Sequence, residues 1–359
     1  MKNNSYNYST LVQFVTILFK RQGRKMHRAR IKALVVMVQG VLYLRQAWLS
    51  GMARGAVILN EETTFVSQLK RAHRLMKNAG VDAWELALVL FSHMTEGQAR
   101  VTVAVDWTVM GHYQVLEACL VVQGRGIPVY CLAVPETELK GRQTTLEMTM
   151  WYALMALRQE GQILVVVADR GFAKFDWIGS CPWAPWMHLC IRLRANMILT
   201  WDTVSGPLQQ WPLWKGEVVY IQRALLGVHR QVVTGMCLAN LGQVPDQPLY
   251  LACAPEDQSI ILEAYKQRGW VEQQNRDLKS PFQMKRIHLA TADRLQRMWM
   301  LMGLAFYISY CNETVQDTAF AQRLGRRYKD GRQDLSWLSL ARYAELSGQV
   351  QLWLRPLAA

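Results

Sequence analysis

The sequence has 359 residues, of which 51% are hydrophobic, and this composition excludes a disordered chain. The length is sufficient for two or three domains with a sizeable core. Lysine and arginine number 41 against 27 aspartate and glutamate residues, so the formal net charge is +14. A charge of this sign favours a polyanionic partner, which is nucleic acid or, as a more remote alternative, an anionic membrane surface.

Cysteine usage and hydropathy indicate a protein of the cytoplasm. The seven cysteines are scattered and include no Cys-x-x-Cys pair, which favours reduced thiols over zinc ligands or disulfides. The most apolar early stretch, residues 33–49, is interrupted by Gln39, Arg45 and Gln46 and is too short to span a membrane. The polar N-terminus lacks a small-residue cleavage site after its apolar run, so no signal peptide is expected.

Residues 1–97 are expected to form a helical domain of two or three short helices. Apolar residues keep helical spacing within 31–49 and 61–77, with residues 51–60 between them. Basic side chains follow the apolar run at 11–19 and cover the outer side of the later helix: Lys20, Arg21, Arg24, Lys25, Arg28, Arg30, Lys32, Lys70, Arg71, Arg74 and Lys77. Such a face suits a helix-turn-helix-like DNA-binding domain, and a helical cap that only packs on the next domain is an equally good interpretation.

Residues 98–194 alternate continuous apolar runs with turns, which is typical of a sheet buried on both faces. Strands are expected at 101–105, 114–122, 127–134, 163–168 and 188–193, a hairpin turn at 124–126, and helices at 144–160 and from about residue 174. Asp106 directly follows the first strand and Asp169 the fourth. Ligand sites of α/β sheets lie beyond strand carboxyl ends, so both are candidates for a site, although helix capping or turn formation is the simpler interpretation of either aspartate alone.

A third carboxylate lies in residues 265–279, which are predicted to form one continuous helix. Five side chains fall on one face of that helix, within an arc of roughly 80°: Tyr265, Arg268, Glu272, Arg276 and Lys279. One carboxylate is thus surrounded by three cations and a phenol, while Trp270, Val271 and Leu278 face the other way and suit packing on a core. A solvated face of salt bridges is the alternative interpretation.

The three acidic residues together can form one metal site. Asp106 and Asp169 would come from adjacent strands, and Glu272 from a helix laid across them. Three like charges in one cleft repel one another and therefore call for cations, and carboxylate oxygens are the ligands that magnesium prefers. Two such ions about 4 Å apart would stabilise the attacking and leaving oxygens of an in-line phosphoryl displacement. We therefore expect Mg²⁺ as the cofactor, with Mn²⁺ as a substitute.

These motifs resemble those of a known family. A strand ending in Asp106, the Ala-Asp-Arg-Gly-Phe at 168–172 and the Tyr-x2-Arg-x3-Glu-x6-Lys at 265–279 resemble the DDE transposases of bacterial insertion sequences, and within them the group called insertion-sequence-four. The resemblance covers roughly residues 98–312. It implies a ribonuclease-H-like domain, with a mixed five-stranded sheet and flanking helices. It also implies that the catalytic metal ligands are Asp106, Asp169 and Glu272.

Candidate DNA contacts lie in and beside these motifs: Tyr265, Arg268, Lys279, Arg170 and Arg276. The resemblance assigns the first three to transposon-end DNA, because arginine and lysine suit phosphate oxygens and tyrosine offers a ring and a hydroxyl. One departure from the family is Gly269, which follows the signature arginine where the family often has tryptophan. Glycine inside a helix costs about 1 kcal/mol and predicts a small kink here.

The distance from Asp169 to Glu272, 103 residues (272 minus 169), exceeds what a minimal ribonuclease-H fold needs. Residues 195–255 are therefore predicted to be a mostly β insertion. Its expected strands are at 218–222, 229–237 and 248–253, and its turns at 203–207, 227 and 243–247. Near its start stand Trp201, Trp211 and Trp214. The resemblance implies that such an aromatic stacks on a base swung out at the transposon end, although packing in a small β core is the simpler interpretation.

The rest of the chain returns to the catalytic core at 256–312, with a helix at 290–310. Residues 313–359 form a basic C-terminal segment with a last helix at 335–346. Its basic residues either grip DNA or belong to a solvated linker: Arg323, Arg326, Arg327, Lys329 and Arg332.

The resulting prediction is a cut-and-paste transposase. It would bind double-stranded DNA at inverted-repeat ends, cleave it with water activated by Mg²⁺, and join the freed 3′ ends to target DNA. In this family the joining of two ends implies a homodimer on DNA, and no membrane partner is expected. Its location would be the bacterial cytoplasm, at the nucleoid. The alternatives are a nuclease of the same fold without strand transfer and a catalytically inactive DNA-binding relative.

Overall fold

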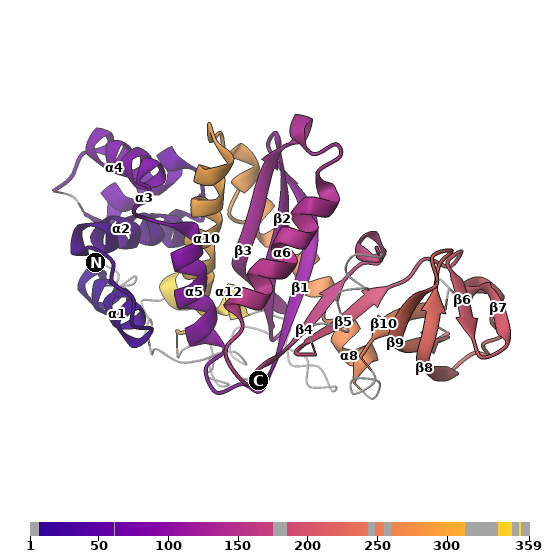
Figure 1. Ribbon diagram of the computed structural model, residues 1–359. Coiled ribbons are helices and arrows are strands. Elements are labelled where there is room, and N and C mark those ends of the chain that lie inside the picture. Colours follow the sequence, from indigo (N-terminus) through magenta and orange to yellow (C-terminus); the bar gives the residue numbers. More distant parts are fainter. Residues whose placement is uncertain are drawn as a thin grey trace. The chain divides into compact units, whose positions relative to one another are not determined.

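The computed structural model describes residues 7–60, 62–174, 185–242, 248–254, 260–312, 337–346 and 352. Its architecture is mixed α/β, with a ten-stranded sheet of parallel and antiparallel strands together with helices (Figure 1). In order across the sheet, the strands are β3 (Arg125–Pro135), β2 (Tyr113–Val122), β1 (Arg100–Met110), β4 (Ile163–Ala168), β5 (Met187–Arg192), β10 (Leu249–Cys253), β9 (Gln231–Ala239), β8 (Val218–Leu226), β6 (Ile198–Trp201) and β7 (Val204–Pro207). The α/β class expected from the sequence is confirmed.

The chain divides into two compact units, which are described one at a time. The first comprises Met1–Gly97, Trp107–Leu139 and Gln273–Ala358. The second comprises Gln98–Asp106 and Lys140–Glu272, with Ala359. Each unit therefore draws on segments that are far apart in the sequence.

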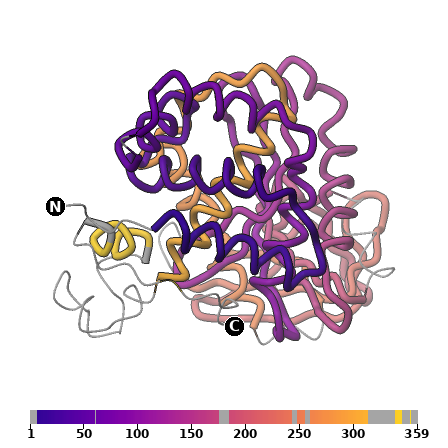
Figure 2. The backbone as a smooth tube through the Cα atoms, turned by 90° about the vertical axis from the view of Figure 1, so that its left-hand side faces the viewer, coloured from indigo at the N-terminus to yellow at the C-terminus, as the bar shows by residue number. Residues whose placement is uncertain are grey.

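Helices dominate the first unit. They are α1 (Tyr8–Arg21), α2 (Arg28–Leu44), α3 (Leu49–Leu59), α4 (Phe65–Lys77), α5 (Ala83–Met94), α10 (Ala292–Tyr310) and α12 (Trp337–Leu346). Figure 2 shows α10 running beside the N-terminal helices, and it contacts α2, α5 and β3. Nearly all of its residues after Leu295 are buried. The helix expected at 290–310 is thus confirmed, and it forms the centre of this unit.

The described part of residues 7–94 holds five helices where two or three were expected. Residues 51–60 were expected to separate two helices, but most of them belong to α3. Glycine serves close packing here, because a Cβ at Gly55 would lie 2.3 Å from the carbonyl oxygen of Gly40. Helix α5 begins after Asp82, whose carboxylate accepts a hydrogen bond from the Trp84 amide at 2.8 Å.

The expected hairpin, which lies in the first unit, is confirmed, but its turn begins one residue earlier. Val122 pairs with Arg125, so the turn is Gln123-Gly124 and Arg125 already belongs to β3. Both turn residues have positive φ, 43° and 81°. This is the backbone of the two-residue turns that match the twist of antiparallel strands, and glycine adopts it without strain.

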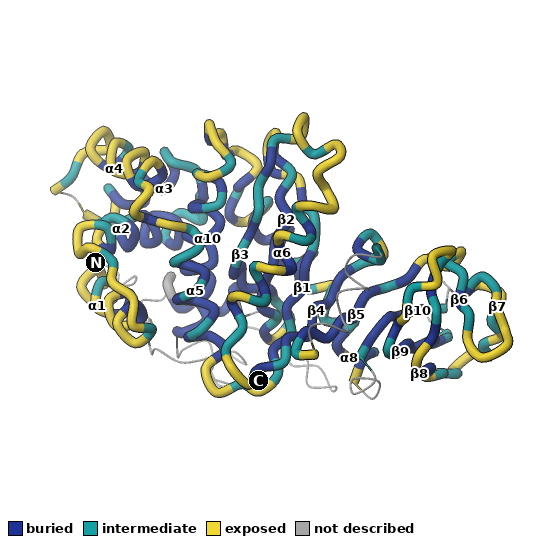
Figure 3. The backbone as a smooth tube through the Cα atoms, in the orientation of Figure 1, coloured by how far each residue is buried: buried dark blue, intermediate teal, exposed yellow. Residues whose placement is uncertain are grey.

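Three neighbouring strands of the second unit run parallel. Strand β4 occupies the range expected for it and pairs in parallel with both β1 and β5. It is almost wholly buried, as Figure 3 shows for the tube of this strand. The expectation that the first strand ends at residue 105 was wrong, because β1 runs on to Met110. The residues beyond Asp106 include Trp107, Thr108 and Val109, aromatic and β-branched types that favour extended backbone.

The β-rich stretch after residue 195 extends the same sheet, since β10 pairs with both β5 and β9. Residues 203–207 were expected to be a turn, but β7 forms there and pairs with β6, which was not anticipated. Both strands are only four residues long, too short for an alternating pattern to be recognised. Strand β8 also runs to Leu226, four residues beyond its expected end. Helix α6 (Gln143–Leu157) stops three residues early, before the turn at Gly161 (φ 78°).

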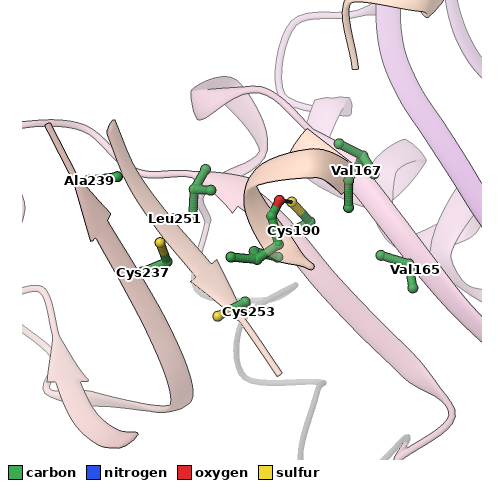
Figure 4. Close-up of a cluster of buried hydrophobic side chains, with 9 residues drawn as sticks. Val165, Val167, Cys190, Cys237, Ala239, Leu251 and Cys253 are labelled. Carbon is green, nitrogen blue, oxygen red and sulfur yellow. Dashed lines mark hydrogen bonds between the residues drawn. The ribbon is translucent and has the colours of Figure 1, made fainter. Parts of the chain in front are cut away.

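A buried apolar cluster connects β4, β5, β9 and β10 with α8 (Ile261–Lys266). Its members are Val165, Val167, Cys190, Cys237, Ala239, Leu251, Cys253, Ile261 and Ala264 (Figure 4). The Cys190 thiol donates to the Ile261 carbonyl oxygen at 3.7 Å. Burial raises the pKa of Cys190 well above its usual value and that of Cys237 to about 12. The six cysteines that the structure describes are buried and form no disulfide, as reduced core thiols should.

Within the described residues, no single helix is both long and apolar enough to cross a membrane; α2 and α3 meet the test only as a pair, which is bent by 92°. Several expectations lie outside the described residues. They are the helix after residue 174, the turn at 243–247 and the basic segment that includes Arg323 and Arg332.

Candidate active site

Two of the three candidate carboxylates lie side by side in the sheet. The parallel register pairs Val105 of β1 with Ala168 of β4, and Asp106 and Asp169 are the next residues of the two strands. Adjacent strands lie about 4.8 Å apart, so the two residues are neighbours. Both are half-buried. Because β1 continues to Met110, Asp106 stands within a strand, at the point where the pairing with β4 ends.

Asp169 also has the capping role that the sequence left open. Its Oδ1 accepts a hydrogen bond from the Gly171 amide at 2.7 Å, at the start of a single 3₁₀ turn over Arg170–Phe172. A Cβ on Gly171 would approach that oxygen to 2.9 Å, so glycine permits the tight turn. Phe172 is buried and fixes the turn on the core. The cap orients the carboxylate and uses one of its two oxygens.

The signature stretch is two helices, so the prediction of one continuous helix was wrong. Helix α8 ends at Lys266 and α9 (Gly269–Lys279) follows a turn at Gln267 and Arg268. Through the turn the amides bond three residues back, Arg268 to Tyr265 at 3.0 Å and Trp270 to Gln267 at 3.0 Å. Bonds of this spacing tighten the helix, and Gly269, which lacks a side chain, stands next to the turn. Tyr265 and Glu272 therefore belong to different helices.

Tyr265 lies within electrostatic reach of three of the charged groups. Burial raises the pKa of its phenol, and the positive charges of Arg268 and Arg192 oppose that shift, whereas Asp169 adds to it. The ring packs against the apolar cluster, so it is half-buried. Arg268 donates from Nη1 and Nη2 to Oε1 of Glu272, the latter bond at 2.8 Å. The side chain of Glu272 remains 45% exposed.

The second half of α9 is fixed by polar contacts within the first unit. Gln274 donates to Glu117 of β2 at 2.7 Å, and both side chains are fully buried. Arg125 of β3 lies 3.2 Å from the Asp277 carboxylate. The expected core face is confirmed for Val271 and Leu278, which are buried.

The two other basic candidates of this helix also lie in the first unit. Lys279 donates to the Thr108 hydroxyl at 2.6 Å. Arg276 is exposed and donates to Gln273 at 3.4 Å. Lys279 is thus held toward the sheet, whereas Arg276 points toward solvent.

A pocket of about 730 Å³ opens beside Asp169 in the second unit. Asp169 lines it together with three arginines and three uncharged polar side chains: Arg170, Arg192, Arg194, Asn196, Gln209 and Tyr250. Arg192 and Arg194 were not anticipated. The signal was available, because Arg192 ends β5, which runs parallel to β4 and so ends at the same edge of the sheet as Asp169.

The two candidate tryptophans have different surroundings. The Trp211 indole donates to the Gly206 carbonyl oxygen at 3.4 Å, and its ring lies 6.3 Å from that of Trp201. It is half-buried, so the interpretation as local packing suits it. Trp214 is 80% exposed. Only Trp214 therefore presents most of its ring to a partner.

The chemistry of the acidic set fits a divalent cation, since Asp106 and Asp169 supply hard carboxylate oxygens from adjacent strands. Among the residues described, however, no three His, Cys, Asp or Glu side chains lie close enough together to hold one ion. Glu272, held by Arg268, is not gathered with the two aspartates in this arrangement.

A model of the transposase DDE domain matches residues 98–308, more than half of the chain. The chain belongs to this family. No curated protein matches the chain. The protein is thus a transposase, an enzyme that acts on DNA, and its family generally uses divalent metal ions. The matched part of the transposase contains Asp106, Asp169, Glu272 and the arginine-lined pocket, and it leaves α1 to α5 outside.

Proposed function

We propose that this transposase is a cut-and-paste enzyme of the insertion-sequence-four type. It binds the inverted-repeat ends of its element, cleaves the DNA and joins the 3′ ends to target DNA. The observation that carries the proposal is the pairing of β1 with β4, which makes Asp106 and Asp169 neighbours beside an arginine-lined pocket. Paired carboxylates next to phosphate-binding side chains suit phosphoryl transfer.

We propose that β3, β2, β1, β4 and β5 are the five-stranded ribonuclease-H-like core. Their order and directions support this: an antiparallel hairpin, β2 and β3, stands on one side of β1, and the parallel strands β4 and β5 stand on the other. Residues 195–255 would then be an insertion between the second and third acids. Residues 1–97 would be the helical DNA-binding domain.

The proposed metal ligands are Asp106, Asp169 and Glu272, with two Mg²⁺ ions or Mn²⁺ in their place. When bound, the ions would lower the pKa of water and stabilise the charge that develops on the phosphate. Glu272 would have to exchange its bond with Arg268 for this role, because the guanidinium already donates to its Oε1. Tyr265, half-buried near Asp169, would orient the DNA rather than take part in proton transfer, since its raised pKa keeps the phenol protonated.

The proposed DNA contacts extend beyond the signature. In the pocket, Arg170, Arg192 and Arg194 would hold phosphates next to the cleaved bond. A guanidinium group suits this role because it can donate two parallel hydrogen bonds to the oxygens of one phosphate. Arg268, Arg276 and Lys279 remain proposed contacts to the transposon end. Trp211 and Trp214 remain proposed stacking residues, and the exposure of Trp214 makes it the better placed of the two. The reaction would be carried out by a homodimer on DNA, at the bacterial nucleoid.

The test is cleavage of a supercoiled plasmid that carries the two ends of the element, with Mg²⁺ or with a chelator. Wild type should cleave only with the metal, and Asp169→Asn should lose cleavage while it still retards the ends in a gel. The matched control is Asp202→Asn, an exposed aspartate with φ 53°, a backbone that asparagine adopts readily. Cleavage that survives in Asp169→Asn would disprove the metal-ligand role.

Adding a target plasmid to the same reaction separates strand transfer from cleavage alone. Products in which the cut ends are joined to the target support the transposase proposal. Cleaved ends that are never joined, under conditions in which both plasmids are bound, indicate a nuclease. A gel shift without any cleavage by wild type indicates an inactive copy.

A further inference from the structure

A second basic pocket lies in the first unit, between α2 and α4. Its volume is about 480 Å³. Four of its lining side chains are cations, and two more are polar: Arg30, Lys70, Arg71, Arg74, Ser67 and Asn78. Among the residues that the structure describes, no carboxylate lines it. The pocket lies outside the residues that match the transposase DDE domain.

The four cations are held in place by the way that the two helices pack. Gln68, Ala72, Leu75 and Met76 of α4 are buried, which turns Lys70, Arg71 and Arg74 outward on the other side of the helix. Arg30 comes from the first turns of α2 and is half-buried. Its guanidinium lies against Gly80, where an added Cβ would meet it at 2.1 Å. The pocket is therefore a feature of the packing rather than of one flexible side chain.

The positive charge of this pocket is not neutralised within the described part of the chain. None of the four cations forms a salt bridge with a described carboxylate, and the Arg71 guanidinium donates to the neutral Gln68 at 3.2 Å. Like charges four residues apart, as in Lys70 and Arg74, destabilise an isolated helix. An arrangement that is unfavourable by itself becomes favourable when an anion occupies it.

We propose that this α2–α4 pocket binds phosphodiester groups of duplex DNA, at a place separate from the candidate active site. This deepens the proposed function and rests on it. Guanidinium and ammonium groups are the side chains that bind phosphate oxygens, and the Ser67 hydroxyl and Asn78 amide add uncharged donors. With four cations and only two uncharged polar side chains, the pocket suits the backbone of DNA rather than its bases. It therefore supplies affinity that does not depend on sequence.

The test is the salt dependence of DNA binding by the full-length transposase. The binding constant K falls as salt rises, and each phosphate contact that is lost reduces the magnitude of the slope of log K against log [salt] by about 0.9. The triple variant Lys70→Gln, Arg71→Gln, Arg74→Gln should therefore reduce the slope by roughly 2 to 3. The reduction should be the same for a duplex that carries the element's end and for one of scrambled sequence. Glutamine favours helix, so α4 should still form.

The matched control removes three charges that lie outside residues 1–97 and line neither pocket: Lys140→Gln, Arg223→Gln, Arg230→Gln. All three side chains are exposed, and none of them is a proposed DNA contact. Its slope should stay within about 0.5 of wild type. An equal loss in control and pocket variants would overturn the proposal, because it would reflect overall charge. A loss confined to the end sequence would also overturn it, because it would indicate base recognition.

Chemical labelling of wild type tests the proposal without a variant. A scrambled duplex should protect Lys70 from acetylation and leave the exposed Lys140 reactive, whereas full reactivity of Lys70 on bound DNA would overturn the proposal. Failure of the proposed function is distinguishable. If the proposed function is wrong but the α2–α4 pocket binds DNA, neither wild type nor any variant cleaves DNA, and the pocket variant still shows the reduced salt dependence. If only this one fails, cleavage is normal and the slopes of wild type and pocket variant are equal.

Discussion

The polar side chains in the two halves of α9 differ in their burial and in the contacts that they make. At its start, Glu272 bonds with Arg268 and remains 45% exposed. Two residues later, Gln274 donates to Glu117 in a fully buried pair, and Asp277, five residues after Glu272, lies beside Arg125. An exposed ion pair contributes about 0–1 kcal/mol to stability, whereas a buried polar group that loses its partner costs about 1–3 kcal/mol. The first half of the helix can therefore change partners cheaply, and the second half cannot.

Within the eleven residues of α9, the side chain proposed to act in the reaction is therefore distinct from those that stabilise the fold. A side chain that must exchange one partner for another during a reaction needs a weak bond in the resting protein. The residues that keep its helix in place need bonds that are not exchanged. Each of the following variants should therefore affect either activity or folding, but not both.

The largest effect is expected for Glu272→Gln. Replacing a side chain that only holds a metal ligand in place typically reduces metal affinity or activity by about 10- to 100-fold, so loss of a ligand itself should reduce cleavage by more than about 100-fold. The melting temperature should barely change, because the pair with Arg268 is half-exposed. Plasmid cleavage and thermal unfolding measure the two quantities. The control is Glu263→Gln, an exposed glutamate of α8 paired with Lys266, which should alter neither.

The opposite pattern is expected for Glu117→Leu. It removes the acceptor of the buried Gln274 amide and should lower the free energy of unfolding by about 1–3 kcal/mol, measured by urea denaturation. Glu117→Gln keeps an acceptor oxygen and should be less destabilising. Cleavage per folded molecule should be preserved in both. A stable Glu117→Leu protein with impaired cleavage would show that the second half of α9 also serves the reaction.

The smallest effect concerns the pH dependence of stability. Burial raises the pKa of Asp277 above its usual value of 3.8, and Arg125 offsets only part of that shift. Because the folded pKa is the higher one, the contribution of Asp277 to stability is full below pH 3.8 and is lost as the pH rises through the folded value. Between about pH 4 and 7, the free energy of unfolding of wild type should therefore fall relative to that of Asp277→Asn. Parallel curves for the two proteins would show that burial does not dominate at this carboxylate.

Much of the candidate site could be predicted from local sequence. A continuous apolar run predicted β4 with its correct bounds, and a long apolar stretch predicted α10 with its start within two residues. Asp106 and Asp169 were identified because each follows such a run. Local signals are sufficient in these cases because a buried strand or core helix is apolar along its length or along one side.

The errors came from short or special local features. The break between α8 and α9 depends on hydrogen bonds that span three residues, which a helical projection does not represent. Residues 51–60 were expected to separate two helices, but most of them form α3, and Gly55 permits this helix to pack closely on α2. A glycine stands at each of these places: Gly269 lies next to a turn, and Gly55 lies inside a helix. Only the neighbours in space decide which of these two uses a glycine has.

The sequence by itself determined the class of fold, the order of the main elements and the acidic and basic residues that identify a transposase. The tertiary structure alone decided which charges meet. It brought Arg192 of β5 to the pocket beside Asp169, and it brought Arg30 of α2 together with Lys70 of α4. The physical reason is the separation along the chain over which each kind of interaction acts. Periodicity and turn chemistry act within about ten residues, whereas charges far apart in the chain become neighbours only after strands pair and helices pack.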